Sequence, residues 1–147
     1  MSDIAWAIEH STEANAPSAF SWKYMTDVKN WDDPPAEFHL QGPFAAGSLG
    51  TTEIPGQVPR RWRLRDVNPS ESYTIQIDIE GAVILCRWMF SELPDGRSRL
   101  TQHITLEGEK SASYKDDVER AFSAGLAPGM RRIADAIGEA YAGDKVH

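Results

Sequence analysis

The sequence predicts an α+β fold in which a curved, seven-stranded antiparallel sheet is combined with two short helices and one long C-terminal helix. Seven segments alternate between apolar and polar residues with a period of two, which is typical of half-buried strands. Short turns, without helices, separate the last six of these segments, so neighbouring strands are expected to run antiparallel. The last third of the chain instead places apolar residues at steps of three and four, the pattern of an amphipathic helix.

Size and composition restrict the class of protein. The 147 residues contain no repeat or linker, so we expect residues 1–147 to form one domain. The composition, with 41% hydrophobic and 25% charged residues, is that of a soluble globular protein, and no apolar run is long enough for membrane insertion. A lone cysteine, Cys86, and the absence of a signal-like start indicate a cytoplasmic protein.

The N-terminal part predicts one strand and two short helices. Residues 4–12 alternate over a length typical of a strand. Asn15 and Pro17 mark a helix start, because Asn caps free backbone N–H groups and Pro is tolerated in the first turn. A second short helical turn ends at Trp31, since the prolines that begin at Pro34 prevent further helix.

The middle of the chain predicts six further strands. In residues 60–67, for example, Trp62 and Leu64 alternate with arginines, which gives the strand one apolar and one charged face. Turn signals such as Pro94 to Gly96 separate the strands. The six segments are residues 38–40, 49–54, 60–67, 73–79, 84–90 and 100–106.

The C-terminal third predicts a long helix with one irregularity. Its apolar stripe consists of Val118, Phe122, Leu126, Met130, Ile133, Ile137 and Tyr141. Pro128 lies within this stripe, and a proline inside a helix costs about 3 kcal/mol. We expect one long helix kinked near residues 125–129, with two helices meeting there as the alternative.

This order of elements predicts a cavity. The early helices are too short to cover a seven-stranded sheet, so the C-terminal helix must lie across its concave face. A strongly curved sheet around one helix leaves space that side chains do not always fill.

Several short motifs follow one another along the chain, at residues 9–17, 27–31, 40–47, 67–69, 73–75 and 125–126. In kind and order they resemble those of bacterial polyketide cyclase/dehydrase-like proteins of the Bet v 1/START-like (SRPBCC) superfamily, and the resemblance extends from about Trp6 to Tyr141. It implies the helix-grip fold of that superfamily. The superfamily includes carriers, aromatases, cyclases, lipid-transfer domains and chaperone activators, so the resemblance specifies the fold far better than the activity.

We therefore expect a small hydrophobic molecule, lipid-, aromatic- or polyketide-like, to bind between the sheet and the C-terminal helix without a further cofactor. Apolar and aromatic walls with a few polar groups are typical of such sites. The alternative is that these side chains only fill the core. The candidate ligand-binding residues are Trp6, Ile8, Trp22, Trp31, Phe38, Leu40, Trp62, Leu64, Ile75, Ile77, Trp88, Phe90, Gln102, Ile104, Phe122, Leu126 and Met130.

His10 is the candidate catalytic residue, because it shares the inward face of its strand and imidazole can move a proton near neutral pH. A cyclase or aromatase that uses His10 is the enzymatic alternative to a binding protein. The simpler interpretation is that His10 is a core residue whose imidazole only makes a structural hydrogen bond. A protein-interaction module of the chaperone-activator type is the third possibility.

Other functions have less support in the sequence. The histidines and Cys86 lack the close spacing of zinc ligands, so we expect no metal site. The net charge of −7 argues against nucleic-acid binding, and the arginines of residues 60–65 are expected on the solvent face, opposite acids such as Asp78. Leu85 and Met89 lie on the outer face of their strand and suggest a homodimer contact, with shielding by long neighbouring side chains as the alternative.

Overall fold

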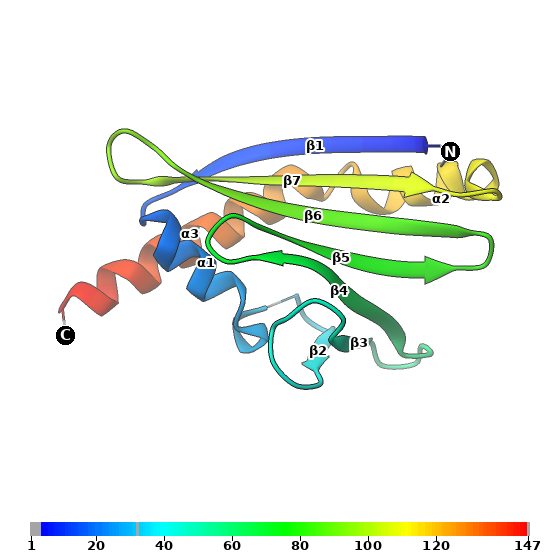
Figure 1. Cartoon of the computed structure of the whole chain (residues 1–147), viewed down its shortest axis with the longest axis horizontal. Helices are drawn as coiled ribbons and strands as arrows, with labels where there is room; N and C mark the ends of the chain where they lie inside the picture. Colours follow the sequence, from blue (N-terminus) through cyan, green and yellow to red (C-terminus); the bar gives the residue numbers. More distant parts are fainter. Residues whose placement is uncertain (1–3, 32, 147) are drawn as a thin grey trace.

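A single antiparallel sheet of seven strands, in the order β1-β7-β6-β5-β4-β3-β2, forms the body of the molecule. The computed structural model describes residues 4–31 and 33–146. The strands are β1 (Ile4–Ala14), β2 (Glu37–Leu40), β3 (Leu49–Glu53), β4 (Arg60–Asn68), β5 (Ser72–Ile79), β6 (Ala82–Glu92) and β7 (Ser98–Glu107). The first and last strands of the chain pair with each other, so β1 and β2 form the two edges (Figure 1).

Within the described residues, three α-helices and one short 3-10 helix accompany the sheet. They are α1 (Ser18–Met25), η1 (Val28–Asn30), α2 (Ser111–Phe122) and α3 (Leu126–Val146). Figure 1 shows α2 and α3 following one another along one face of the sheet, with α1 beside α3. No helix in the described ranges combines the length and the apolar character needed to cross a membrane.

The C-terminal helix is divided into two rather than kinked. The first helix ends at Phe122 and the second begins at Leu126. Pro128 thus lies in the first turn of α3, where its missing N–H needs no acceptor and its fixed φ suits a helix start. The expected single helix is therefore wrong, and the alternative of two helices is the one observed.

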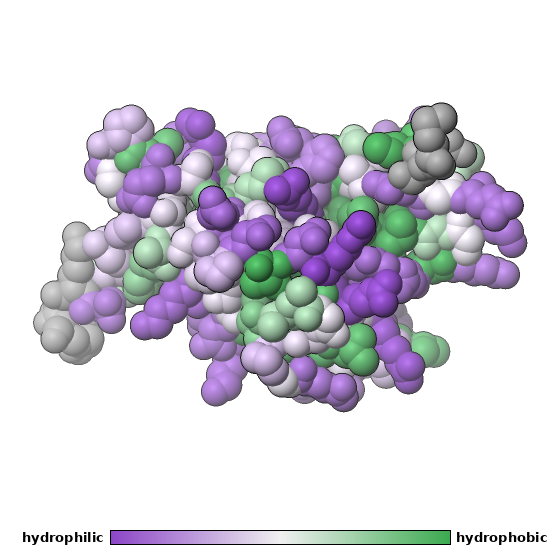
Figure 2. Space-filling view, in the orientation of Figure 1, coloured by the Kyte–Doolittle hydropathy of each residue, from purple (hydrophilic) through white to green (hydrophobic). Residues whose placement is uncertain are grey.

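Alternation along the strands separates a buried face from an exposed one. Trp62 and Leu64 of β4 are buried, whereas Arg61, Arg63 and Arg65 are exposed, as predicted. The Arg63 guanidinium lies 3.9 Å from the Asp78 carboxylate on the neighbouring strand. Figure 2 shows a mainly hydrophilic surface in this view, with hydrophobic side chains in small separate groups.

The helices do not cover the sheet evenly. Among the strands, α3 packs mainly on β1 at one edge, and α2 packs on β1 and β7. Helix α1 contacts β6 and β7, and η1 contacts β2 at the opposite edge of the sheet. A space remains between α3 and the middle strands, and the candidate site occupies it.

Candidate functional site

A cavity of about 640 Å³ lies between the sheet and the helices. Its size falls within the range of about 300–1,000 Å³ that is typical of small-molecule sites. Strands β2, β5, β6 and β7 form one wall, α2 and α3 form the opposite wall, and α1 with η1 closes one end. The cavity expected from the curved sheet and its covering helix is therefore present.

Most of the wall is apolar. Ile104 and Met130 are buried almost completely and face the space from the sheet and from α3. Aromatic rings also line the cavity, and Trp31 packs edge-on against Phe38 with ring centroids 5.5 Å apart. Such a wall favours an apolar ligand, because each Å² of apolar surface removed from water contributes about 25 cal/mol.

Small residues on the helical wall keep the cavity open. Gly125 and Gly129 line it, together with Ala121 and Ala136. A Cβ atom added at Gly129 would come within 4 Å of only one distant side-chain atom, Nη2 of Arg132, at 3.7 Å. A larger side chain at this position has room to enter the space, and the glycine therefore contributes directly to its volume.

Tyr73 on β5 places a phenol in the wall of the cavity. The residue is fully buried, and its hydroxyl has no hydrogen-bond partner. Its ring packs edge-on against Trp22 and Phe44, with centroids 5.9 and 4.9 Å away, so its position is fixed. Burial raises the pKa of Tyr73 far above its ordinary value of 10.0, which keeps the phenol neutral and able to donate a proton in a hydrogen bond.

Tyr73 belongs to a row of polar side chains that crosses the concave face. The strand register places His10 opposite Gln102, Gln102 opposite Trp88, and Trp88 opposite Tyr73. Within the described residues, none of these four side chains makes a hydrogen bond. Gln102, Trp88 and Tyr73 also line the cavity, although the Tyr73 hydroxyl itself is closed off from solvent.

Two other indole groups on the concave side are already occupied. Trp31 donates a hydrogen bond from Nε1 to the carbonyl oxygen of Met25 at 2.7 Å, and Trp62 donates to Oγ1 of Thr52 at 3.1 Å. Trp88 is therefore the tryptophan on the cavity wall that keeps its N–H free for a ligand within the described chain.

Charged groups on the lining come from Asp33 and from Arg132 of α3, and both side chains are exposed. Neither makes an ion pair in the part of the chain that the structure describes. Because these exposed charges share the lining with buried apolar residues, the cavity has one polar, solvated side.

Nine of the predicted ligand-binding residues lie on the cavity wall. They are Trp31, Phe38, Ile75, Trp88, Gln102, Ile104, Phe122, Leu126 and Met130. The remaining eight do not line it, and some of them pack behind the residues that do, as Trp22 does against Tyr73. These eight are Trp6, Ile8, Trp22, Leu40, Trp62, Leu64, Ile77 and Phe90.

His10 also lies outside the lining, although it shares the concave face with Gln102. Helix α3 packs on its strand, so the register alone does not bring the imidazole to the cavity. A catalytic role for His10 remains a prediction.

Several lining residues were not predicted from the sequence. Tyr73 shares the inward register of Ile75, and this alternation was sufficient to find it. Arg132, Ile133 and Ala136 follow Met130 within the next two turns of α3, but only the three-dimensional arrangement shows which side of the helix meets the cavity. Tyr24, Met25, Asn30 and Asp33 come from the segment around α1 and η1, whose position over the sheet has no periodic signal.

Comparison with known proteins identifies the fold. No family model matches the chain, and no curated protein matches its sequence.

Solved structures do resemble it. A point mutant of norcoclaurine synthase from Thalictrum flavum, in complex with a transition-state analogue, superposes with a TM-score of 0.73 at 12% identity. The superposition covers 96% of this chain and 98% of the synthase. A protein from Thermobifida fusca gives a TM-score of 0.72 at 14% identity, over 90% and 93% of the two chains. A protein from Nitrosomonas europaea gives 0.68 at 9% identity, over 90% and 94%. The chain therefore has the Bet v 1-like helix-grip fold that the sequence predicts.

Proposed function

We propose that the protein binds a small, mainly apolar molecule that carries at least one hydrogen-bonding group, in the cavity between the sheet and α3. The observation that carries the proposal is the cavity wall itself, in which Tyr73, Trp88 and Gln102 lie side by side without hydrogen-bond partners. An unpaired buried polar group costs about 1–3 kcal/mol, and a ligand that pairs with it recovers this free energy. Ligand specificity then comes from the polar row, and affinity comes from the apolar walls.

Contact with Tyr73 requires a small adjustment of the wall. Its hydroxyl is closed off from water as well as unpaired. Trp22 and Phe44 pack against the ring, so a modest rotation of one of these neighbours must accompany hydrogen bonding to a ligand. Trp88 and Gln102 are the other polar groups of the row that line the cavity.

Binding is favoured over turnover by the position of His10. A cyclase or aromatase that uses this residue as a base requires the imidazole within hydrogen-bonding reach of the substrate. His10 is separated from the cavity lining, and Gln102 is its nearest partner in that row. The similarity to norcoclaurine synthase, which has been solved in complex with dopamine and hydroxybenzaldehyde, supports small-molecule binding on this fold without carrying the reaction over. A lipid-, aromatic- or polyketide-like ligand and a cytoplasmic location are part of the proposal.

The proposal is tested by filling the cavity. Gly129→Leu places an isobutyl group in the open space beside α3, so it is expected to reduce binding of an apolar fluorescent probe at least tenfold. Gly143→Leu is the matched control, because that glycine lies on the same helix, has open space around it and is outside the cavity. Both changes replace a helical glycine and raise helix propensity by a similar amount.

Native mass spectrometry of freshly purified protein gives a second readout. A stoichiometric adduct that is released on denaturation in the wild type, retained by Gly143→Leu and lost in Gly129→Leu supports the proposal. Equal probe binding by the two variants contradicts it, as does a wild-type protein that carries no adduct and takes up no probe.

A further inference from the structure

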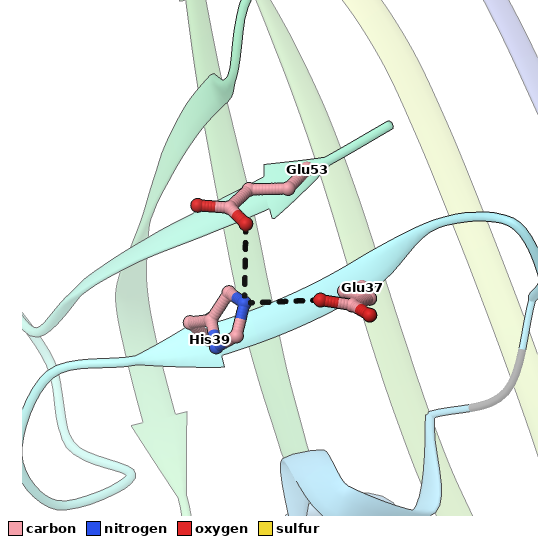
Figure 3. Close-up of side chains that lie close together, drawn as sticks. All are labelled: Glu37, His39 and Glu53. Atoms are coloured by element: carbon pink, nitrogen blue, oxygen red, sulfur yellow. Dashed lines mark ion pairs between the residues drawn. The ribbon is translucent and has the colours of Figure 1, made fainter. Parts of the chain in front are cut away.

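A histidine and two glutamates meet on the outer face of the sheet edge. Glu37 and His39 lie two residues apart on β2, and Glu53 lies at the end of β3 (Figure 3). Phe38 points to the opposite face of β2 and lines the ligand cavity, so the cluster is separated from that cavity by the sheet. The three side chains are exposed and can move without disturbing the core.

The ligand atoms are spaced almost as a metal ion requires. Nε2 of His39 is 3.6 Å from a carboxylate oxygen of Glu53 and 3.9 Å from one of Glu37, and all three atoms lie within 4.8 Å of one another. In a tetrahedral zinc site with bonds of about 2.0–2.2 Å, ligand atoms are about 3.3–3.6 Å apart. Movements of less than about 1 Å by exposed side chains therefore complete three corners of a tetrahedron.

The charges of the cluster favour a cation. The strand register places Glu37 directly opposite Glu53, and like charges in this arrangement destabilise a sheet. Within the described residues, His39 is the only group that pairs with either carboxylate. Arg61 lies on the same face, one strand farther along the sheet, but forms no ion pair with them.

A surface hollow of about 300 Å³ adjoins the cluster. Both glutamates line it, together with Pro35, Pro55 and Pro59, whose rings give it stiff walls. A metal ion held by the three side chains would have its fourth position available to water or a small anionic ligand from this hollow.

We propose that Glu37, His39 and Glu53 form a binding site for a divalent transition-metal ion, with Zn²⁺ as the best match. One imidazole and two carboxylates suit Zn²⁺, whereas Ca²⁺ and Mg²⁺ favour oxygen ligands only. The proposal is independent of the ligand cavity, because the cluster and the cavity lie on opposite faces of β2.

The test is a titration of the untagged protein with Zn²⁺ near neutral pH, by competition with a chromophoric chelator, supported by the visible spectrum of Co²⁺. We expect one bound ion per chain and a loss of affinity of at least about tenfold in both His39→Ala and Glu53→Gln, since even indirect partners of a metal change affinity on this scale. Zn²⁺ is also expected to raise the denaturation midpoint of the wild type and to leave those of the two variants unchanged.

His103→Ala is the matched control. His103 lies on the outer face of β7 with Nδ1 at 3.3 Å from a single carboxylate, that of Glu9, so it pairs with an acid but lacks a second one. Zn²⁺ affinity should be the same in this variant as in the wild type. Failure of the wild type to bind Zn²⁺ at one equivalent overturns the proposal, as does unchanged affinity in His39→Ala. Either failure leaves the cluster as an ion pair of His39 and does not affect the test of the cavity.

Discussion

Tyr73 combines complete burial with a hydroxyl that forms no hydrogen bond, and this combination is costly for a folded protein. Leu or Phe at this position would pack against Trp22 and Phe44 without that cost. The cost is explained if the hydroxyl serves a ligand. At the scale of single residues, Tyr73 therefore connects the stability of the fold with its proposed function.

Tyr73→Phe is expected to separate these two effects. Removal of the hydroxyl should leave the free energy of unfolding unchanged or raise it by up to about 1–3 kcal/mol, because no hydrogen bond is lost. The same change should weaken any ligand that pairs with Tyr73. Urea denaturation measures the first effect, and competition with an apolar probe by the ligand extracted from the wild type measures the second.

Tyr114→Phe gives the comparison for this prediction. The Tyr114 hydroxyl donates a hydrogen bond to the carbonyl oxygen of Glu80 at 2.8 Å, so its removal should cost about 0.5–1.5 kcal/mol. A comparable loss of stability in Tyr73→Phe would mean that the Tyr73 hydroxyl has a partner in the folded protein.

At the scale of elements, the break between α2 and α3 decides how the C-terminal segment covers the sheet. At the end of α2, the Ser123 N–H donates a hydrogen bond to the Glu119 carbonyl oxygen. At the start of α3, the Gly129 N–H donates a hydrogen bond to the Gly125 carbonyl oxygen. The break at residues 123–125 divides the segment into one helix on β1 and β7 and another that lies mainly on β1. Residues from both sides of the break, Phe122 and Leu126, reach the cavity.

Pro128→Ala tests the position of this proline. In the first turn of α3 the proline costs nothing, so its replacement should lower the free energy of unfolding by no more than about 0.4–1 kcal/mol through greater freedom of the unfolded chain. In the interior of a continuous helix the same change would stabilise the protein by about 3 kcal/mol. Urea denaturation distinguishes the two results by their sign.

The strands were predictable because alternation is a local property of the sequence. Trp62 and Leu64 are buried and their neighbouring arginines exposed, as period two requires. The helix break was less predictable, because Pro128 is equally compatible with a kink and with a new first turn.

The sequence predicts the ligand cavity much better than it predicts the proposed metal site. Nine predicted residues line the cavity, and five of them lie on strands, along which inward positions can be counted. The cluster of Glu37, His39 and Glu53 was not foreseen, because His39 and Glu53 become neighbours only through the pairing of β2 with β3. Sequence spacing shows two of these residues and gives no sign of the third.

At the scale of the whole molecule, the concave face buries two weak acids beside each other. Cys86 lies opposite Ile75 on the adjacent strand, and burial raises the pKa of its thiol from 9.0 to about 12. Burial also raises the pKa of Tyr73, with a smaller contribution from Cys86. Both groups are neutral in the folded protein over the whole range in which they begin to ionise in the unfolded chain.

This difference predicts a loss of stability in alkali. Each folded-state pKa is raised, so its contribution is fully present below the unfolded value, 9.0 for the thiol and 10.0 for the phenol, and falls as the pH rises toward the folded value. We expect the free energy of unfolding to fall above pH 9 by up to about 1.4 kcal/mol per pH unit for the thiol alone. Urea denaturation at a series of pH values from about 7 to about 10.5 measures the slope.

Cys86→Ala isolates the contribution of the thiol from all other groups that titrate in alkali. The variant should be less stable than the wild type near neutral pH, since it leaves a small void in the core. The difference between the two proteins should then shrink above pH 9, because only the wild type must hold a thiol protonated in order to fold. A constant difference across this range would show that the thiol ionises equally easily in both states, and hence that the concave face admits water around Cys86.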